Sequence, residues 1–142
     1  MQNIGLAILW FFICYIIVTA VGMIHTVFNI YVLHMKPIDE NSMGEGYEKT
    51  KPWHPLYNII LFSVFGYVYM RGLASPAFSE ALITGAIWFA IAIVIDAFGW
   101  VIIKHPWSLS FNDFYINYQP WITLIYIAIF LGPLIGYAVC LI

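Results

Sequence analysis

Charged side chains are scarce in this sequence of 142 residues. Lys and Arg together number 5 and Asp and Glu number 7, so charged residues make up 8% of the chain. Soluble domains carry about 25% charged and about 45–50% apolar residues, whereas 63% of this chain is hydrophobic and its mean hydropathy is +0.91. Such a chain cannot cover a water-facing surface with polar groups, which excludes a soluble globular protein. Intrinsic disorder is excluded as well, because it requires low hydrophobicity and high net charge.

Positive charge and cysteine are also rare. The net charge at pH 7 is −2 and no cluster of Lys or Arg occurs, so the chain has no surface that would neutralise nucleic-acid phosphates. We therefore expect the lipid bilayer as a partner and no nucleic acid. The two cysteines, Cys14 and Cys140, lie in different apolar segments. Their positions predict neither a disulfide nor a cysteine-based metal or redox site.

Four apolar stretches are long enough to be considered as membrane spans, for which about 20 residues are needed. They predict an all-α polytopic membrane protein with four transmembrane helices in a single domain. The predicted spans cover residues 4–33, 55–72, 81–103 and 121–142. The first stretch has no preceding positive charge and continues past the small residues at which a signal peptide would be cleaved. We therefore expect it to be a retained helix.

The few basic residues predict the orientation of these spans. Four lysines occupy the two long loops, residues 34–54 and 104–120, whereas Arg71 is alone on the other side. Because cytoplasmic loops carry an excess of Lys and Arg, both long loops should be cytoplasmic and both termini outside. The sequence thus predicts a multi-pass protein of a bacterial cytoplasmic membrane.

The two halves of the chain share a short pattern. Lys-Pro-Trp at 51–53 and Gln-Pro-Trp at 119–121 each precede a predicted helix. Proline suits a helix start and tryptophan suits the headgroup region, so each motif has a local explanation. Alternatively, a helical hairpin has been duplicated, which would give two parallel hairpins related by an axis along the membrane normal.

Asp96 is the one acidic residue placed deep in a predicted span. An aspartate near the centre of a membrane helix costs about 2.5–3.5 kcal/mol, so we expect it to face the bundle interior and to have a partner. The first and third predicted helices run in the same direction. His25 precedes His34, and Asp96 precedes His105, by nine residues each. If the two later histidines mark the same boundary, His25 lies at the depth of Asp96 and is its expected partner.

The candidate substrate or proton site is built around this pair. Asn29 lies four residues after His25 and shares its helix face, and Trp88 lies on the same side of its helix as Asp96. We expect His25, Asn29, Trp88 and Asp96 to form the site. Two alternatives remain for Asp96: a structural hydrogen bond that fixes helix packing, or a neutral carboxyl that faces lipid.

One stripe of the third predicted helix carries polar and aromatic residues at intervals of four. Its members are Glu80, Thr84, Trp88, Ala92, Asp96 and Trp100. Residues with this spacing lie along one helix face, so the stripe could line a water-filled pathway or form a helix contact. In the first case Arg71, Glu80 and Thr84 would form an outer approach, with Arg71 paired to Glu80 across a short loop.

Three further histidines, His34, His54 and His105, are expected near the cytoplasmic boundary. They are weak candidates for a metal site, because neither HxxxH nor HExxH spacing occurs. A bis-histidine haem is still less favoured, since only His25 lies deep in a span. We therefore predict no metal and no cofactor.

Three classes of function fit these features. The first is a transport or permeation element with a protonatable His25/Asp96 site. The second is a non-catalytic membrane subunit or regulator, whose hydrophilic loop 34–54 would meet a partner. The third, an intramembrane enzyme acting on lipid, is disfavoured because we find no nucleophile, and we therefore predict no catalytic residues. Because four helices enclose little space, the first two classes predict a homo-oligomer or a partner membrane protein.

Overall fold

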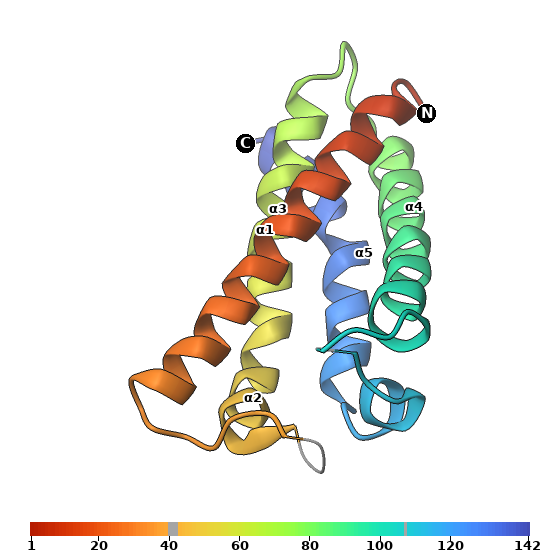
Figure 1. Ribbon diagram of the computed structural model, residues 1–142. Helices are drawn as coiled ribbons and strands as arrows, with labels where there is room; N and C mark the ends of the chain where they lie inside the picture. Colours follow the sequence, from red (N-terminus) through yellow and green to blue (C-terminus); the bar gives the residue numbers. More distant parts are fainter. Residues whose placement is uncertain (40–42, 107) are drawn as a thin grey trace.

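The computed structural model is a bundle of long helices (Figure 1). The structure describes residues 1–39, 43–106 and 108–142. The helices are, in chain order, α1 (Ile4–Tyr31), α2 (Gly44–Thr50), η1 (Lys51–Trp53), α3 (His54–Arg71), α4 (Phe78–Asp96), η2 (Ala97–Ile102), η3 (Asn112–Ile116) and α5 (Trp121–Cys140). No strand occurs in these ranges, which confirms the prediction of an all-helical protein.

Three of the helical segments are long and apolar enough to cross a membrane. They are α1, the continuous segment Phe78–Ile102 made of α4 and η2, and α5. Within the described chain α3 does not qualify by composition, so three of the four predicted spans are supported. The reason is composition, because the 18 residues of α3 include His54, Asn58 and Arg71. The three apolar helices indicate a membrane-embedded protein.

The long helices alternate in direction (Figure 1). α1 and α4 run from the end that holds the chain termini towards the end that holds α2 and η3, and α3 and α5 run back. Both termini therefore lie at one end of the bundle and both long loops at the other. α3 and α5 are parallel to each other, and they form the most extensive helix pair in the described chain.

Glycine permits the close approach of α3 and α5. A Cβ atom added at Gly132 would lie 2.6 Å from the Cβ and 2.7 Å from the carbonyl carbon of Phe62. One added at Gly66 would lie 2.7 Å from the Cα of Pro133. Small residues allow membrane helices to pack backbone against backbone and so to gain van der Waals contact. Neither glycine position accepts a side chain unless the helices separate.

The first long loop folds back onto the bundle as α2. Asn29 Nδ2 donates to the carbonyl of Gly46 at 3.0 Å and to Oγ1 of Thr50 at 3.1 Å, and Thr26 Oγ1 donates to the same Thr50 oxygen at 3.2 Å. All four residues are buried. Because buried polar groups are costly unless they are hydrogen-bonded, this network holds α2 against α1.

Removing the central donor of this network should loosen α2. We expect Asn29→Ala to weaken the packing of α2 on α1 by about 1–3 kcal/mol, because two buried acceptors lose a donor. Amide hydrogen exchange in detergent micelles should then accelerate over residues 43–50. Lys49→Ala, on the exposed side of α2, is the control and should leave exchange unchanged. Equal protection in wild type and Asn29→Ala would contradict this role.

Candidate functional site

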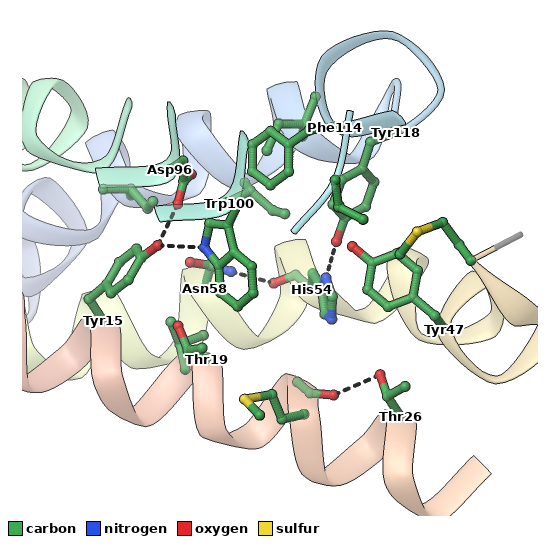
Figure 2. Close-up of a pocket in the computed structure, with 18 of the residues that line it drawn as sticks. Tyr15, Thr19, Thr26, Tyr47, His54, Asn58, Asp96, Trp100, Phe114 and Tyr118 are labelled. Atoms are coloured by element: carbon green, nitrogen blue, oxygen red, sulfur yellow. Dashed lines mark hydrogen bonds between the residues drawn. The ribbon is translucent and has the colours of Figure 1, made fainter. Parts of the chain in front are cut away.

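A cavity of about 130 Å³ lies towards the loop end of the bundle, between α1, α3, α5 and the segments that follow α4 (Figure 2). Apolar cavities of about 150 Å³ accept a benzene ring, so this one suits a ligand of similar size. Most of its wall is apolar. The described polar or amphipathic side chains in its lining belong to Tyr15, Thr19, Thr26, Tyr47, His54, Asn58, Asp96, Trp100 and Tyr118.

Asp96 lies in the cavity wall at the end of α4 and is 6% exposed. Its Oδ1 accepts a hydrogen bond of 2.5 Å from the hydroxyl of Tyr15, and that hydroxyl accepts one of 3.1 Å from Trp100 Nε1. Tyr126 of α5 also approaches the carboxyl, although its buried hydroxyl has no partner of normal hydrogen-bond geometry among the described residues. Among the residues that the structure describes, no Lys, Arg or His forms an ion pair with Asp96.

The helix that carries Asp96 changes its winding directly after this residue. Residues 97–102 form the π-helical turn η2, and 112–116 form a second one, η3. π-Helical turns are rare and occur often at functional sites. The first contributes Trp100, which hydrogen-bonds Tyr15, and the second contributes Phe114 to the cavity wall. Both irregular turns therefore supply side chains to the same cavity.

His54 forms a second polar centre in the cavity (Figure 2). Its Nδ1 hydrogen-bonds the hydroxyl of Tyr118, and its backbone carbonyl accepts a bond of 2.8 Å from Asn58 Nδ2. Its Nε2 is buried without a partner among the described residues, against Gly22, where an added Cβ would lie 2.9 Å away. Burial lowers the pKa of His54 to about 4, so the ring is neutral at neutral pH.

A buried lysine lies beside the loop side of the cavity. Lys51 is 4% exposed, and its Nζ lies 2.6 Å from Oε1 of Glu48 and 5.4 and 5.2 Å from the ring centres of Tyr47 and Tyr118. Burial raises the pKa of both tyrosines above the usual value, so their hydroxyls stay protonated. Lys51 itself is not part of the cavity lining, and its charge is already paired.

The structure does not bring His25 to Asp96. His25 Nδ1 hydrogen-bonds the hydroxyl of Tyr57 at 2.6 Å, and His25 is not among the residues that line the cavity. The expected pairing rested on depth along the helices and did not include the direction in which each side chain points. Successive residues of a helix are rotated by about 100°, so His25 points away from the face that carries Thr26. The hydrogen-bond partner of Asp96 is Tyr15, which sequence reasoning did not select.

Asn29 is likewise absent from the cavity, because its amide is used in the α1–α2 network.

The stripe on α4 is a helix contact face over most of its length. Trp88 is fully buried and its Nε1 donates to the carbonyl of Ala7 at 2.9 Å, and Thr84 Oγ1 donates to the carbonyl of Glu80 at 2.8 Å. Only the last two members of the stripe line the cavity.

The expected pair of Arg71 and Glu80 is also wrong. Arg71 Nη1 donates to the hydroxyl of Tyr67 at 2.8 Å, one helical turn away on α3. Glu80 is 5% exposed and accepts bonds from the Tyr69 hydroxyl at 2.7 Å and from the backbone N–H of Gln2 at 2.9 Å. Because both groups have nearer partners, the outer approach predicted from the stripe is not assembled.

The three boundary histidines have separate environments. His34 is exposed with a φ of 55°, His54 bonds Tyr118, and His105 Nε2 bonds the carbonyl of Gly99 at 2.7 Å. In the part of the chain that the structure describes, no three His, Cys, Asp or Glu side chains lie close enough together to hold a metal ion. Both cysteines are free thiols.

Comparison of this chain with protein-family models, with curated proteins and with solved structures finds no match. The chemistry of the cavity is therefore the basis for its function. Of the described lining groups, the tyrosine hydroxyls are weak acids and His54 is neutral, so Asp96 is the group best able to carry charge. The arrangement can exchange a proton or bind a donor at that carboxyl.

Proposed function

We propose that this chain is a small integral membrane protein in which the cavity at Asp96 serves as a protonatable transport or permeation site. The position of Asp96 carries the proposal. It is a carboxyl within a helix of membrane-spanning length, faces a cavity, and has hydroxyl neighbours in place of a cation. Ionisable residues inside membrane helices are costly and mark substrate, ion or proton pathways.

The cavity argues against a purely structural role for Asp96. A packing device would explain the hydrogen bond with Tyr15. It would not explain the open volume beside the carboxyl, because protein interiors are close-packed and each cavity costs stability. A binding site accounts for both the fixed carboxyl and the space next to it.

The route from the cavity towards the terminal end is filled by aromatic rings. Phe11, Phe62 and Trp88 are all 0% exposed, with ring centres 5.6 to 6.2 Å apart. Transport by alternating access requires a central site that is closed on one side at a time. This aromatic cluster would be the closed side, and the cavity lies on the other side of it, towards the long loops.

The proposed orientation of the bundle in the membrane rests on the distribution of lysines. All four lie in the two long loops, which share one end of the bundle (Figure 1). By the positive-inside rule, that end is cytoplasmic and the termini are outside, an arrangement in which α3 also crosses the membrane beside the three apolar helices. Homo-oligomerisation or a partner membrane protein remains part of the proposal, because the cavity is small compared with a continuous pathway.

The proposal is tested by reconstituting the purified protein into liposomes with a pH gradient and an enclosed pH-sensitive dye. We expect wild-type protein to dissipate the gradient faster than empty liposomes, and Asp96→Asn to reduce the rate to background. Asparagine keeps the shape of the side chain but cannot exchange a proton. Glu45→Gln, on the exposed side of α2, makes the same change of charge and should retain the wild-type rate.

Two results would contradict the proposal. One is wild-type liposomes that dissipate the gradient no faster than empty ones. The other is an Asp96→Asn rate equal to that of wild type.

A non-catalytic subunit or regulator is the second candidate, and α2 supports it. Its buried side packs on α1, whereas Glu45, Glu48 and Lys49 are exposed on its other side. These charges would suit a soluble partner. The described cavity lining contains neither serine nor cysteine, so the third candidate, an enzyme acting on lipid, receives no support from this site.

A further inference from the structure

The cavity combines a single carboxyl with walls of aromatic and aliphatic groups. Asp96 lies at one end beside Tyr15 and Trp100, and Asn58 and His54 follow towards the loops (Figure 2). The remaining wall is mostly hydrocarbon, from Val18, Phe114, Ile122, Ile125 and Ile129. An apolar pocket with a few fixed polar groups is the usual form of a small-molecule site.

Charge favours a cationic ligand. Asp96 has no cation partner among the described residues, and Lys51, near the loop side, is paired with Glu48. A carboxylate has about four positions at which it can accept a hydrogen bond, and the Tyr15 hydroxyl fills one of them. An unpaired buried carboxylate is costly. A ligand that brings its own positive charge would relieve this cost, whereas an anion would be repelled.

The rings around the carboxyl suit the same ligand. Aromatic faces attract ammonium groups, and tryptophan does so best. Tyr15 and Trp100 lie next to Asp96, joined by a hydrogen bond of 3.1 Å. The volume of about 130 Å³ leaves space beyond the charged group for one ring or a short branched chain.

We propose that the cavity binds a compact protonated amine, whose ammonium group donates to Asp96 and whose apolar body packs against the hydrocarbon wall. This names the substrate class of the transport site and rests on the proposed function. Binding itself requires only the cavity and its carboxyl, so it is measured separately from flux.

The test uses benzylamine and benzyl alcohol, which have nearly the same shape and differ in charge. Isothermal titration calorimetry is done on the full chain in detergent micelles at neutral pH. We expect wild-type protein to bind benzylamine about tenfold or more tightly than benzyl alcohol, since a hydrogen bond to a charged group outweighs a neutral one by that factor. Equal affinities, or no binding of either compound, would overturn the proposal.

Variants show whether the preference arises at Asp96. Asp96→Asn should make the two affinities equal, whereas Glu45→Gln should keep the wild-type ratio. A preference for benzylamine that survives in Asp96→Asn would place the recognition elsewhere and overturn the proposal. If Asp96→Asn does not fold, Thr19→Phe keeps the carboxyl and fills part of the cavity. It should weaken both compounds about tenfold, and unchanged affinities would show that they bind outside the cavity.

Flux and binding separate the two proposals. Selective binding of benzylamine without Asp96-dependent dissipation of a pH gradient would leave this inference standing and overturn the transport function. Asp96-dependent dissipation of the gradient without selective binding of benzylamine would leave the transport function standing and overturn the inference that the cavity binds a protonated amine.

Discussion

Trp88→Ala should lower the free energy of unfolding by about 3–5 kcal/mol and make the bundle leaky to protons. Trp88 is fully buried, in contact with Phe11 and Phe62, and its Nε1 donates to the carbonyl of Ala7. Truncating a buried tryptophan to alanine removes its packing and leaves a cavity, which accounts for a loss of this size.

The leak follows from where Trp88 lies. The ring belongs to the aromatic cluster between the Asp96 cavity and the terminal end of the bundle, so we expect its removal to let water into this barrier. Proton leakage should rise in liposomes even when Asp96→Asn is combined with Trp88→Ala, because the new opening does not depend on the carboxyl.

Thermal unfolding in detergent, followed by circular dichroism, measures the stability, and a dye inside liposomes measures the leak. Trp88→Phe is the matched control, because it keeps a ring at this position and loses only part of the packing. It should cost clearly less stability and should not leak. An unfolding temperature and leak in Trp88→Ala equal to those of wild type would show that this ring does not close the cavity.

Gly132→Ala should destabilise the protein by about 1–3 kcal/mol, which is the usual cost of overpacking a filled interior. The added methyl would lie 2.6 Å from Phe62 Cβ and 2.7 Å from its carbonyl carbon. Backbone atoms cannot move aside as a flexible side chain can, so α3 and α5 would have to separate. This contact is the most extensive between helices in the described chain, and its loss should lower the unfolding temperature in detergent.

Gly5→Ala is the control for this prediction. A Cβ added at Gly5 meets only Asn3 Oδ1, at 3.8 Å, in ordinary contact. Alanine is preferred over glycine inside helices by about 0.5–1 kcal/mol, so this variant should be as stable as wild type or slightly more so. If Gly132→Ala has the same unfolding temperature as Gly5→Ala, the close approach of α3 and α5 is not required for the stability of the protein.

Composition alone predicted a helical membrane protein, and it located the long helices well. The predicted stretches 4–33 and 121–142 correspond to α1 and α5, because a continuous apolar run of this length leaves few alternatives to a helix. The stretch 55–72 forms α3, but its polar residues make it less apolar than the other three long helices. Length was therefore a good guide to helices and a weaker guide to membrane crossing.

The partner of Asp96 was not predictable in the same way. The cost of an intramembrane carboxyl follows from its position in the sequence, so Asp96 was selected. Its partner depends on how α1 is rotated about its axis, and a rotation of one residue separates the face of Thr26 from that of His25. One signal was present: Tyr15, Thr19, Gly22 and Thr26 are spaced by three or four residues and so share a face.

The scarcity of charge and the long apolar runs by themselves predicted an apolar, helical protein suited to a membrane, and they singled out one carboxyl for attention. Those conclusions rest on transfer free energies, which add up along the chain. Only the tertiary structure decided that Asp96 faces a cavity beside Tyr15, that Trp88 is buried against Phe11 and Phe62, and that glycines permit the close approach of α3 and α5. Those features depend on helix rotation and contact between distant segments, which the order of residues does not display.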